Sequence, residues 1–200
     1  MEADLDDASL IEASLADPGA FGGLFDRHAP PLLGYLIRRV GATDGELLLS
    51  ELFRIAFEAR HRYQRDRADA RPWLYGIAAK LVMKHLRTEG RRRTAMERLA
   101  ARRDTAQPFD EQVSTEMATV ELWARVAAAI NQLPQRDREL ILLYAWEELT
   151  YAQIAEALEI PIGTVRSRLN RIRGTLRELV VDYGQEPDVP THGAGGGATR

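Results

Sequence analysis

The chain has 200 residues, of which 45% are hydrophobic and 28% charged, and its formal net charge is −3. This composition is typical of a folded globular protein and excludes a mainly disordered or fibrous chain. The absence of Cys excludes disulfides, thiolate zinc sites and a cysteine nucleophile, and it fits a reducing compartment.

Neither export nor membrane insertion is expected from the sequence. The first 26 residues carry seven acids and no Lys or Arg, the reverse of the basic start of a secretory signal. The longest apolar run, Leu140–Trp146, has seven residues, whereas a membrane-spanning helix needs roughly 20. We therefore predict a cytoplasmic protein that has no membrane partner.

Apolar residues in the first half of the chain recur three or four positions apart, as one buried face of a helix requires. This spacing predicts a four-to-five-helix bundle. In chain order, the expected helices run over Ala8–Leu15, from Asp17-Pro18 through Phe25, from Pro30-Pro31 to Val40, from Asp44 through Phe57, and from Arg71-Pro72 through Leu86. Asp17 and Asp44 are expected as N-caps, and Gly41 as a helix end.

The second half begins with an acidic stretch, since Asp104 to Glu121 holds five acids and no base. Residues 104–117 lack helical periodicity and are predicted to be a flexible linker. Further helices are expected over Leu122–Ile130, Asp137–Glu147, from Thr150 to the turn at Glu159–Pro161, and from there to about Val181. The prediction is an all-α protein with two small helical domains, 1–103 and 118–181, and a disordered tail, 182–200.

Basic residues are concentrated in one block. From Arg54 to Arg103 there are 15 Lys or Arg against five acids, and 25 of the chain's 27 basic residues are Arg. Arg binds phosphates and guanine edges with two parallel hydrogen bonds, so the block favours a polyanionic partner. A solvated helix face is the alternative for any single stretch.

The segment Thr150–Leu169 has the pattern of a helix-turn-helix: a short capped helix, the small Ala155, a tight turn, and a second helix. Glu159 stands where Gly would suit the turn better. One face of the second helix is apolar, carrying Val165, Leu169, Ile172 and Leu176. The opposite arc carries side chains that can read bases in the major groove, namely Arg166, Ser167, Asn170 and Arg171. The alternative is an amphipathic helix whose polar face happens to be basic.

Several segments of the chain resemble a known family. Leu133–Leu143 followed by Thr150–Arg173 resembles region 4 of bacterial sigma factors, of the extracytoplasmic-function (ECF) group of the sigma-70 family. Phe21–Pro30 with Leu32–Val40 resembles the start of region 2, and Arg71–Ala78 through Arg87 its promoter-melting end. The resemblance covers roughly residues 8–103 and 118–181.

The resemblance implies a transcription initiation factor without a cofactor, whose partners are core RNA polymerase, promoter DNA and, in some family members, an anti-sigma factor. The residues it assigns to the duplex minus-35 element are Thr164, Arg166, Ser167, Arg168, Asn170, Arg171 and Arg173. Those assigned to the melted minus-10 element are Trp73, Tyr75, Lys80, Lys84, Arg87, Arg91, Arg92 and Arg93. Those assigned to polymerase binding are Asp44, Glu46, Leu47, Ser50 and Glu51.

The residue types of the minus-10 set suit a single strand, because aromatic rings stack on bases while basic groups attract phosphates. Trp73, at a helix start, has packing in the core as its alternative role. The chain departs from the family pattern at Leu47 and Ser50, which replace an acid and an amide, and at Lys80 and Lys84, which replace Asn and Asp. These changes leave polymerase affinity and promoter opening less well predicted than minus-35 recognition.

Two alternatives to a sigma factor remain at the level of sequence. One is a helix-turn-helix regulator that binds duplex DNA without acting as a sigma factor. The other is an enzyme, but the sequence contains no Gly-rich phosphate loop, no metal-ligand spacing and no nucleophile paired with a base. The scattered His28, His61 and His85 are interpreted as structural or surface residues, so no catalytic or metal-binding residue is expected.

Overall fold

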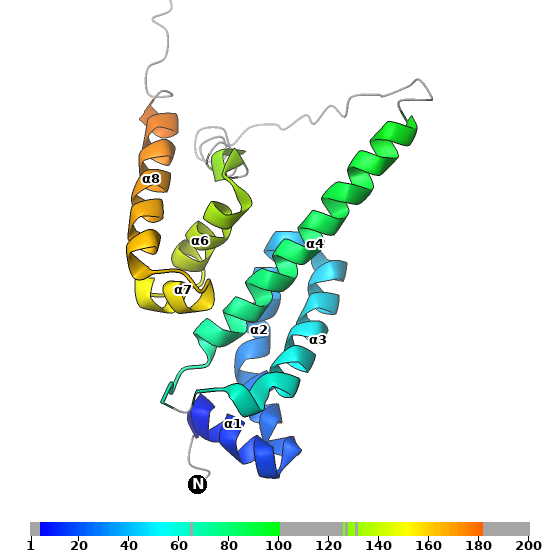
Figure 1. Ribbon diagram of the computed structural model, residues 1–200, viewed down its shortest axis with the longest axis vertical. Helices are drawn as coiled ribbons and strands as arrows, with labels where there is room; N and C mark the ends of the chain where they lie inside the picture. The colour runs from blue at the N-terminus through cyan, green and yellow to red at the C-terminus, as the bar shows by residue number, and fades with distance from the viewer. Residues whose placement is uncertain (1–4, 65, 101–125, 127, 131, 182–200) are drawn as a thin grey trace, which may run out of the picture.

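The computed structural model describes residues 5–64, 66–100, 126, 128–130 and 132–181, with side chains as far as 92 in the first part and 178 in the second. Its regular structure within these residues is entirely helical, as predicted (Figure 1). The predicted linker and tail lie outside the described residues, as does most of the helix expected over Leu122–Ile130. None of the described helices is long and apolar enough to cross a membrane.

The first domain is a bundle in which the long helix α4 lies across α2 and α3 (Figure 1). Its elements are α1 (Asp7–Ala16), the 3₁₀ turn η1 (Pro18–Ala20), α2 (Phe21–Val40), α3 (Ala42–Ala59), the 3₁₀ turn η2 (Arg60–Arg62) and α4 (Arg71–Ala100). The buried stripes of these helices meet in one core that includes Leu24, Leu32, Leu36, Leu52, Leu74 and Val82. Periodicity therefore predicted most of the core-facing residues, but Phe25, Ile37 and Leu47, which share the same apolar spacing, are exposed.

Two predicted helix starts are wrong. Pro30 and Pro31 lie inside α2 instead of beginning a new helix. Both prolines are on the exposed side, where water can bond the carbonyls that lose a helical partner, while the buried stripe continues past them. Asp44 is not an N-cap, because α3 begins at Ala42 after Gly41. Gly41 does end α2, with φ of 87°, a conformation that favours Gly.

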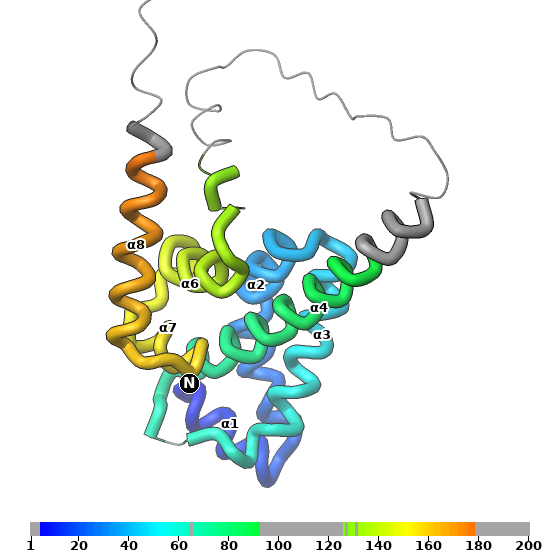
Figure 2. The backbone as a smooth tube through the Cα atoms, turned by 45° about the horizontal axis from the view of Figure 1, so that its top comes forward, coloured from blue at the N-terminus to red at the C-terminus, as the bar shows by residue number. Residues whose placement is uncertain are grey.

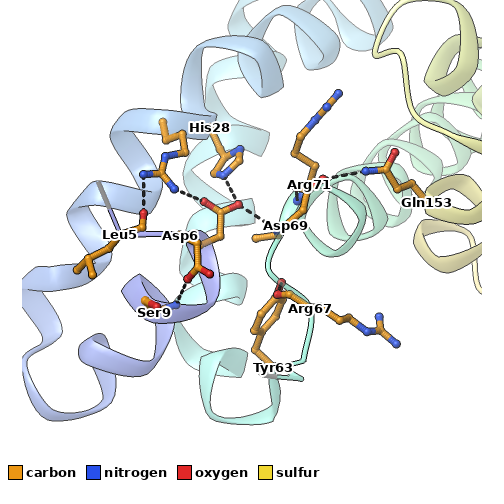
Figure 3. Close-up of polar contacts among 12 residues, drawn as sticks. Leu5, Asp6, Ser9, His28, Tyr63, Arg67, Asp69, Arg71 and Gln153 are labelled. Carbon is orange, nitrogen blue, oxygen red and sulfur yellow. Dashed lines mark hydrogen bonds and ion pairs between the residues drawn. The ribbon is translucent and has the colours of Figure 1, made fainter. Parts of the chain in front are cut away.

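A buried ion cluster fixes α1 to the start of α4 (Figure 3). The Asp7 carboxylate bonds Arg27 Nη1 at 2.6 Å and His28 Nε2 at 2.8 Å, and it accepts the Ala70 backbone N–H at 2.9 Å. Burial alone would raise the pKa of Asp7, but these hydrogen bonds outweigh it and lower the pKa to about 2. His28 is thus a structural residue, as expected.

The second domain consists of α6 (Gln135–Ala145), α7 (Tyr151–Ala157) and α8 (Ile162–Val181). Thr150 caps α7 in a reciprocal capping box with Gln153, which accounts for the helix start that the sequence predicts. The turn to α8 places Glu159 at φ 53°, the left-handed conformation that made Gly the expected residue. Leu140, Leu143, Ile154, Val165 and Leu169 are fully buried between the three helices.

The two domains are in direct contact. In Figures 1 and 2, α7 lies beside the N-terminal half of α4, and α6 lies near α2. α8 packs on α6 and α7.

Candidate nucleic-acid interface

The helix-turn-helix has the geometry expected from its sequence. Ile160 N–H donates to the Ala155 carbonyl at 3.0 Å, which closes the turn after α7. The apolar stripe of α8 is buried, with Val165 and Leu169 at 0% exposure and Ile172 at 1%. Burial of this stripe fixes the rotation of α8 about its axis, and the opposite side therefore faces away from the domain core.

The outward arc of α8 carries exposed residues suited to reading bases. Arg166, Ser167 and Asn170 are exposed, and the Ser167 hydroxyl donates to the Thr164 carbonyl at 3.1 Å. Arginine can bind guanine and asparagine can bind adenine with two hydrogen bonds each in a major groove. This side of α8 is therefore a candidate surface for duplex DNA.

Other arginines of α8 are held by neighbouring groups. Arg171 donates from Nη2 to Asp137 Oδ2 at 2.6 Å, and Arg168 Nη1 lies 3.9 Å from Asp137 Oδ1. The guanidinium carbon of Arg173 lies 5.0 Å from the centre of the Tyr144 ring, in cation–π contact. Helix α6 thus restrains the cations along one side of the exposed arc.

The basic side chains on α4 are at the surface. Lys80, Lys84, Arg87, Arg91 and Arg92 are exposed. Arg92 donates to Glu89 at 3.0 Å, and Lys80 Nζ lies 2.6 Å from Glu159 Oε1 of the second domain. The side chain of Arg93 is outside the described part. The exposed cations can bind phosphates by charge alone.

The two aromatic residues predicted for the melted strand occupy different environments. The Trp73 ring is half-buried against Tyr63, with centroids 5.0 Å apart. Tyr75 is only 2% exposed and donates its hydroxyl to Glu147 Oε2 at 2.5 Å. Burial, followed by this bond to Glu147, raises the pKa of Tyr75. Tyr75 therefore offers no stacking surface in this structure, contrary to the expectation from its neighbours in sequence.

The predicted polymerase-binding residues lie along α3. Leu47 is 65% exposed, so it is a surface residue and not part of the bundle core. The Ser50 hydroxyl donates to the Glu46 carbonyl at 3.2 Å. Glu51 pairs with Arg54, and Asp44 lies 3.6 Å from His85 of α4. An exposed leucine among acids suits a protein partner better than solvent.

Sequence reasoning missed the residues that join elements: Gly76, Asp137, Glu139 and Glu147. Gly76 had a visible signal, since it interrupts an apolar helical pattern, where Gly usually has a packing reason. The three carboxylates are ordinary by residue type and spacing. No group of three His, Asp or Glu side chains in the described residues could hold a metal ion.

Comparison with known proteins identifies the family. A model described as "Sigma-70 region 2" matches residues 24–92, and one described as "Sigma-70, region 4" matches residues 123–176. The chain is 31% identical over 191 residues to the ECF RNA polymerase sigma-E factor of Haemophilus influenzae, over 90% of this chain and 98% of that protein. It is 33% identical over 174 residues to the RNA polymerase sigma-H factor of Pseudomonas aeruginosa, over 84% of this chain and 90% of that protein.

The chain belongs to the ECF sigma factors. As a sigma factor it binds core RNA polymerase and directs transcription initiation at promoter DNA. The presence of both regions decides against a helix-turn-helix regulator without sigma activity.

The fold is shared with solved sigma factors. One is CnrH in complex with the cytosolic domain of CnrY, with a TM-score of 0.61 and 23% identity over 88% of this chain and 97% of that chain. Another is RpoE from Bartonella quintana in complex with the anti-sigma factor NepR, with a TM-score of 0.58 and 20% identity over 80% of this chain and 96% of that chain.

Proposed function

We propose that this sigma factor reads the minus-35 element through the outward arc of α8. The observation that carries the proposal is the rotation of α8: its apolar stripe is buried, and Arg166, Ser167 and Asn170 are exposed together on the other side. A helix that presents this arc fits a major groove, and Arg171 belongs to the same base-reading arc. Arg168, Arg173 and Arg177 flank the arc as phosphate contacts.

The melted minus-10 strand is assigned to α4, whose exposed cations include Lys84, Arg87 and Arg91. Charge supports this assignment more than stacking does, because Tyr75 is buried and Trp73 is half-buried. The polymerase surface is assigned to the first turns of α3, around Leu47. We also propose that the two domains comprise residues 1–103 and 118–181.

In vitro transcription with purified core polymerase and a library of promoters tests this assignment. Native protein is expected to yield promoter-dependent transcripts that share one minus-35 sequence. Replacing Arg166, Ser167, Asn170 and Arg171 together by Ala is expected to abolish that preference. The matched control, Thr175→Ala with Glu178→Ala, changes exposed residues further along the same helix, beyond the four arc residues, and should retain the preference. An unchanged preference in the fourfold variant would contradict the assignment.

We also propose that the protein acts in the cytoplasm, where promoter DNA and polymerase are found, and that it catalyses no reaction itself. An anti-sigma protein is a further proposed partner. The support is that the solved neighbours are complexes, one with CnrY and one with the anti-sigma factor NepR. Co-purification of a specific protein that blocks transcription in the assay above would test this partner.

A further inference from the structure

The two domains approach each other closely at Gly76 of α4. A Cβ atom at this position would lie 2.7 Å from the Ala157 carbonyl oxygen and 3.4 Å from the Ala157 carbonyl carbon and Cα. All three atoms belong to the backbone of α7, so they cannot move aside as a flexible side chain could. The contact between α4 and α7 therefore depends on glycine at position 76.

This contact covers the part of α4 that is proposed to hold the melted strand. Trp73, Gly76 and Lys80 form one wall of a groove of about 500 Å³, and Ala157 and Glu159 of the second domain lie on the other wall. A single strand that reached Trp73 and Lys80 would occupy the space next to α7. The strand and α7 are thus alternative neighbours of the same residues.

Two departures from the expected sequence pattern meet at this interface. Lys80 replaces the family's Asn, and Glu159 occupies a turn position where Gly would suit the backbone. Their charged groups lie 2.6 Å apart. Because both side chains are exposed, this pair adds little affinity, but it places a carboxylate where a phosphate would otherwise bind Lys80.

Hydrogen bonds on either side hold the two domains in this arrangement. Gln153 Nε2 of α7 donates to Asp69 Oδ2 at 2.8 Å (Figure 3), and Arg67 pairs with Glu156. Two buried carboxylates of the second domain complete the interface. Glu147 accepts from Tyr75 and Arg38, and Glu139 accepts from Tyr35 and Arg39.

We propose that α7 is a built-in competitor of single-stranded DNA for α4, and that Gly76 is the residue that allows it to dock there. In this closed arrangement, groups of the second domain bind the cations of α4 nearest to Trp73, and these cations are then not accessible to a DNA phosphate. Opening of the two domains exposes them. The inference rests on the proposed assignment of α4 to the melted strand, but its interface is defined by contacts within the chain.

The first test measures the distance between the domains in the full chain. The chain has no Cys, so spin labels can be placed on Asp26→Cys in α2 and Thr175→Cys in α8, both at exposed positions. Double electron–electron resonance should give one narrow distribution of distances between the two labels for the native interface. Gly76→Ala should broaden and lengthen it. Gly90→Ala, in the same helix but with nothing within 4 Å of the added Cβ, should not.

A second variant covers the case in which Gly76→Ala does not fold. Glu139→Gln with Glu147→Gln removes the charges of the two buried interface carboxylates of the second domain without altering α4. This variant should also broaden the distance distribution. An unchanged distribution in every folded interface variant would overturn the proposal.

The second test measures binding of a fluorescein-labelled random-sequence single strand to the free protein. Gly76→Ala changes no charge, so a gain in affinity reports access alone. If nine-tenths of native molecules are closed, the gain should be about tenfold, and Gly90→Ala should show none. Domains that open without any gain in affinity would overturn the competition.

The transcription assay separates this inference from the proposed function. If neither native protein nor Gly76→Ala supports promoter-dependent transcripts, the proposed function fails. The distance and single-strand measurements still decide whether α7 and DNA compete for α4.

Discussion

The contact between Asp137 and Arg171 makes a quantitative prediction about promoter recognition. Asp137 lies in the first turn of α6 and has a side chain only 6% exposed, and its carboxylate holds Arg171 at 2.6 Å across the α6–α8 interface. Asp137→Asn keeps the shape of the side chain but removes its charge. Arg171 should then sample more orientations over the DNA, and discrimination between bases should fall.

The expected loss of discrimination depends on how far the Asp137–Arg171 hydrogen bond is exposed to solvent. A hydrogen bond between charged groups contributes about 1.5–3 kcal/mol when it is shielded. Arg171 is 66% exposed, and solvent screening reduces the coupling to about 1 kcal/mol. Asp137→Asn should therefore lower the ratio of specific to non-specific affinity about fivefold.

The assay is fluorescence anisotropy with two duplexes, one carrying the minus-35 sequence recovered from the promoter library and one scrambled. The ratio of the two affinities is the measured quantity, because removing an acid near DNA also raises non-specific binding. Glu178→Gln makes the same charge change at an exposed position of α8 and is the control. If Asp137→Asn lowers the ratio as much in an Arg171→Ala background, Asp137 does not act through Arg171 and the reasoning is refuted.

Three further predictions concern the first domain. Asp7→Asn should cost about 2 kcal/mol at pH 7, because the pKa of Asp7 is lowered to about 2 in the folded state; in urea unfolding, this difference from native protein should shrink as the pH falls from about 4 towards 2, and a constant difference would contradict it. Leu47→Asp should leave helical circular dichroism intact, since Leu47 is 65% exposed, and should weaken binding to core polymerase about tenfold by removing apolar contact; a collapse of helicity, or unchanged binding by calorimetry, would contradict the proposed surface. Replacing Arg91 and Arg92 by Gln should flatten the slope of log affinity against log salt for a single strand by about 0.7 for each phosphate that is no longer neutralised, and an unchanged slope would place the strand elsewhere.

Local patterns in the sequence predicted the elements that depend on local interactions. The capping box at Thr150, the helix end at Gly41 and the buried stripe of α8 each involve residues within a few positions of one another. Such features depend on backbone chemistry and on helical periodicity, which a single sequence contains. The helix-turn-helix and its exposed arc were predictable for the same reason.

The errors arose where packing outweighed a local signal. Pro30 and Pro31 are strong helix breakers, yet α2 continues through them because Leu24, Leu32 and Leu36 bury a stripe that spans both sides. Tyr75 lies among cations in sequence, but its ring is directed into the domain interface and its hydroxyl bonds Glu147, which is 72 residues away. Neighbours in sequence therefore did not reveal its surroundings.

The sequence by itself determined that the chain is helical, where most of the buried residues of its helices lie, and which family it resembles. Only the tertiary structure determined that α7 docks on α4 at Gly76, that Asp137 holds Arg171, and that Glu139 and Glu147 join the two domains. The physical reason is the range of the interactions. Helix periodicity repeats within a few residues, whereas these contacts join residues between 34 and 109 positions apart, so packing of the whole chain determines which residues meet.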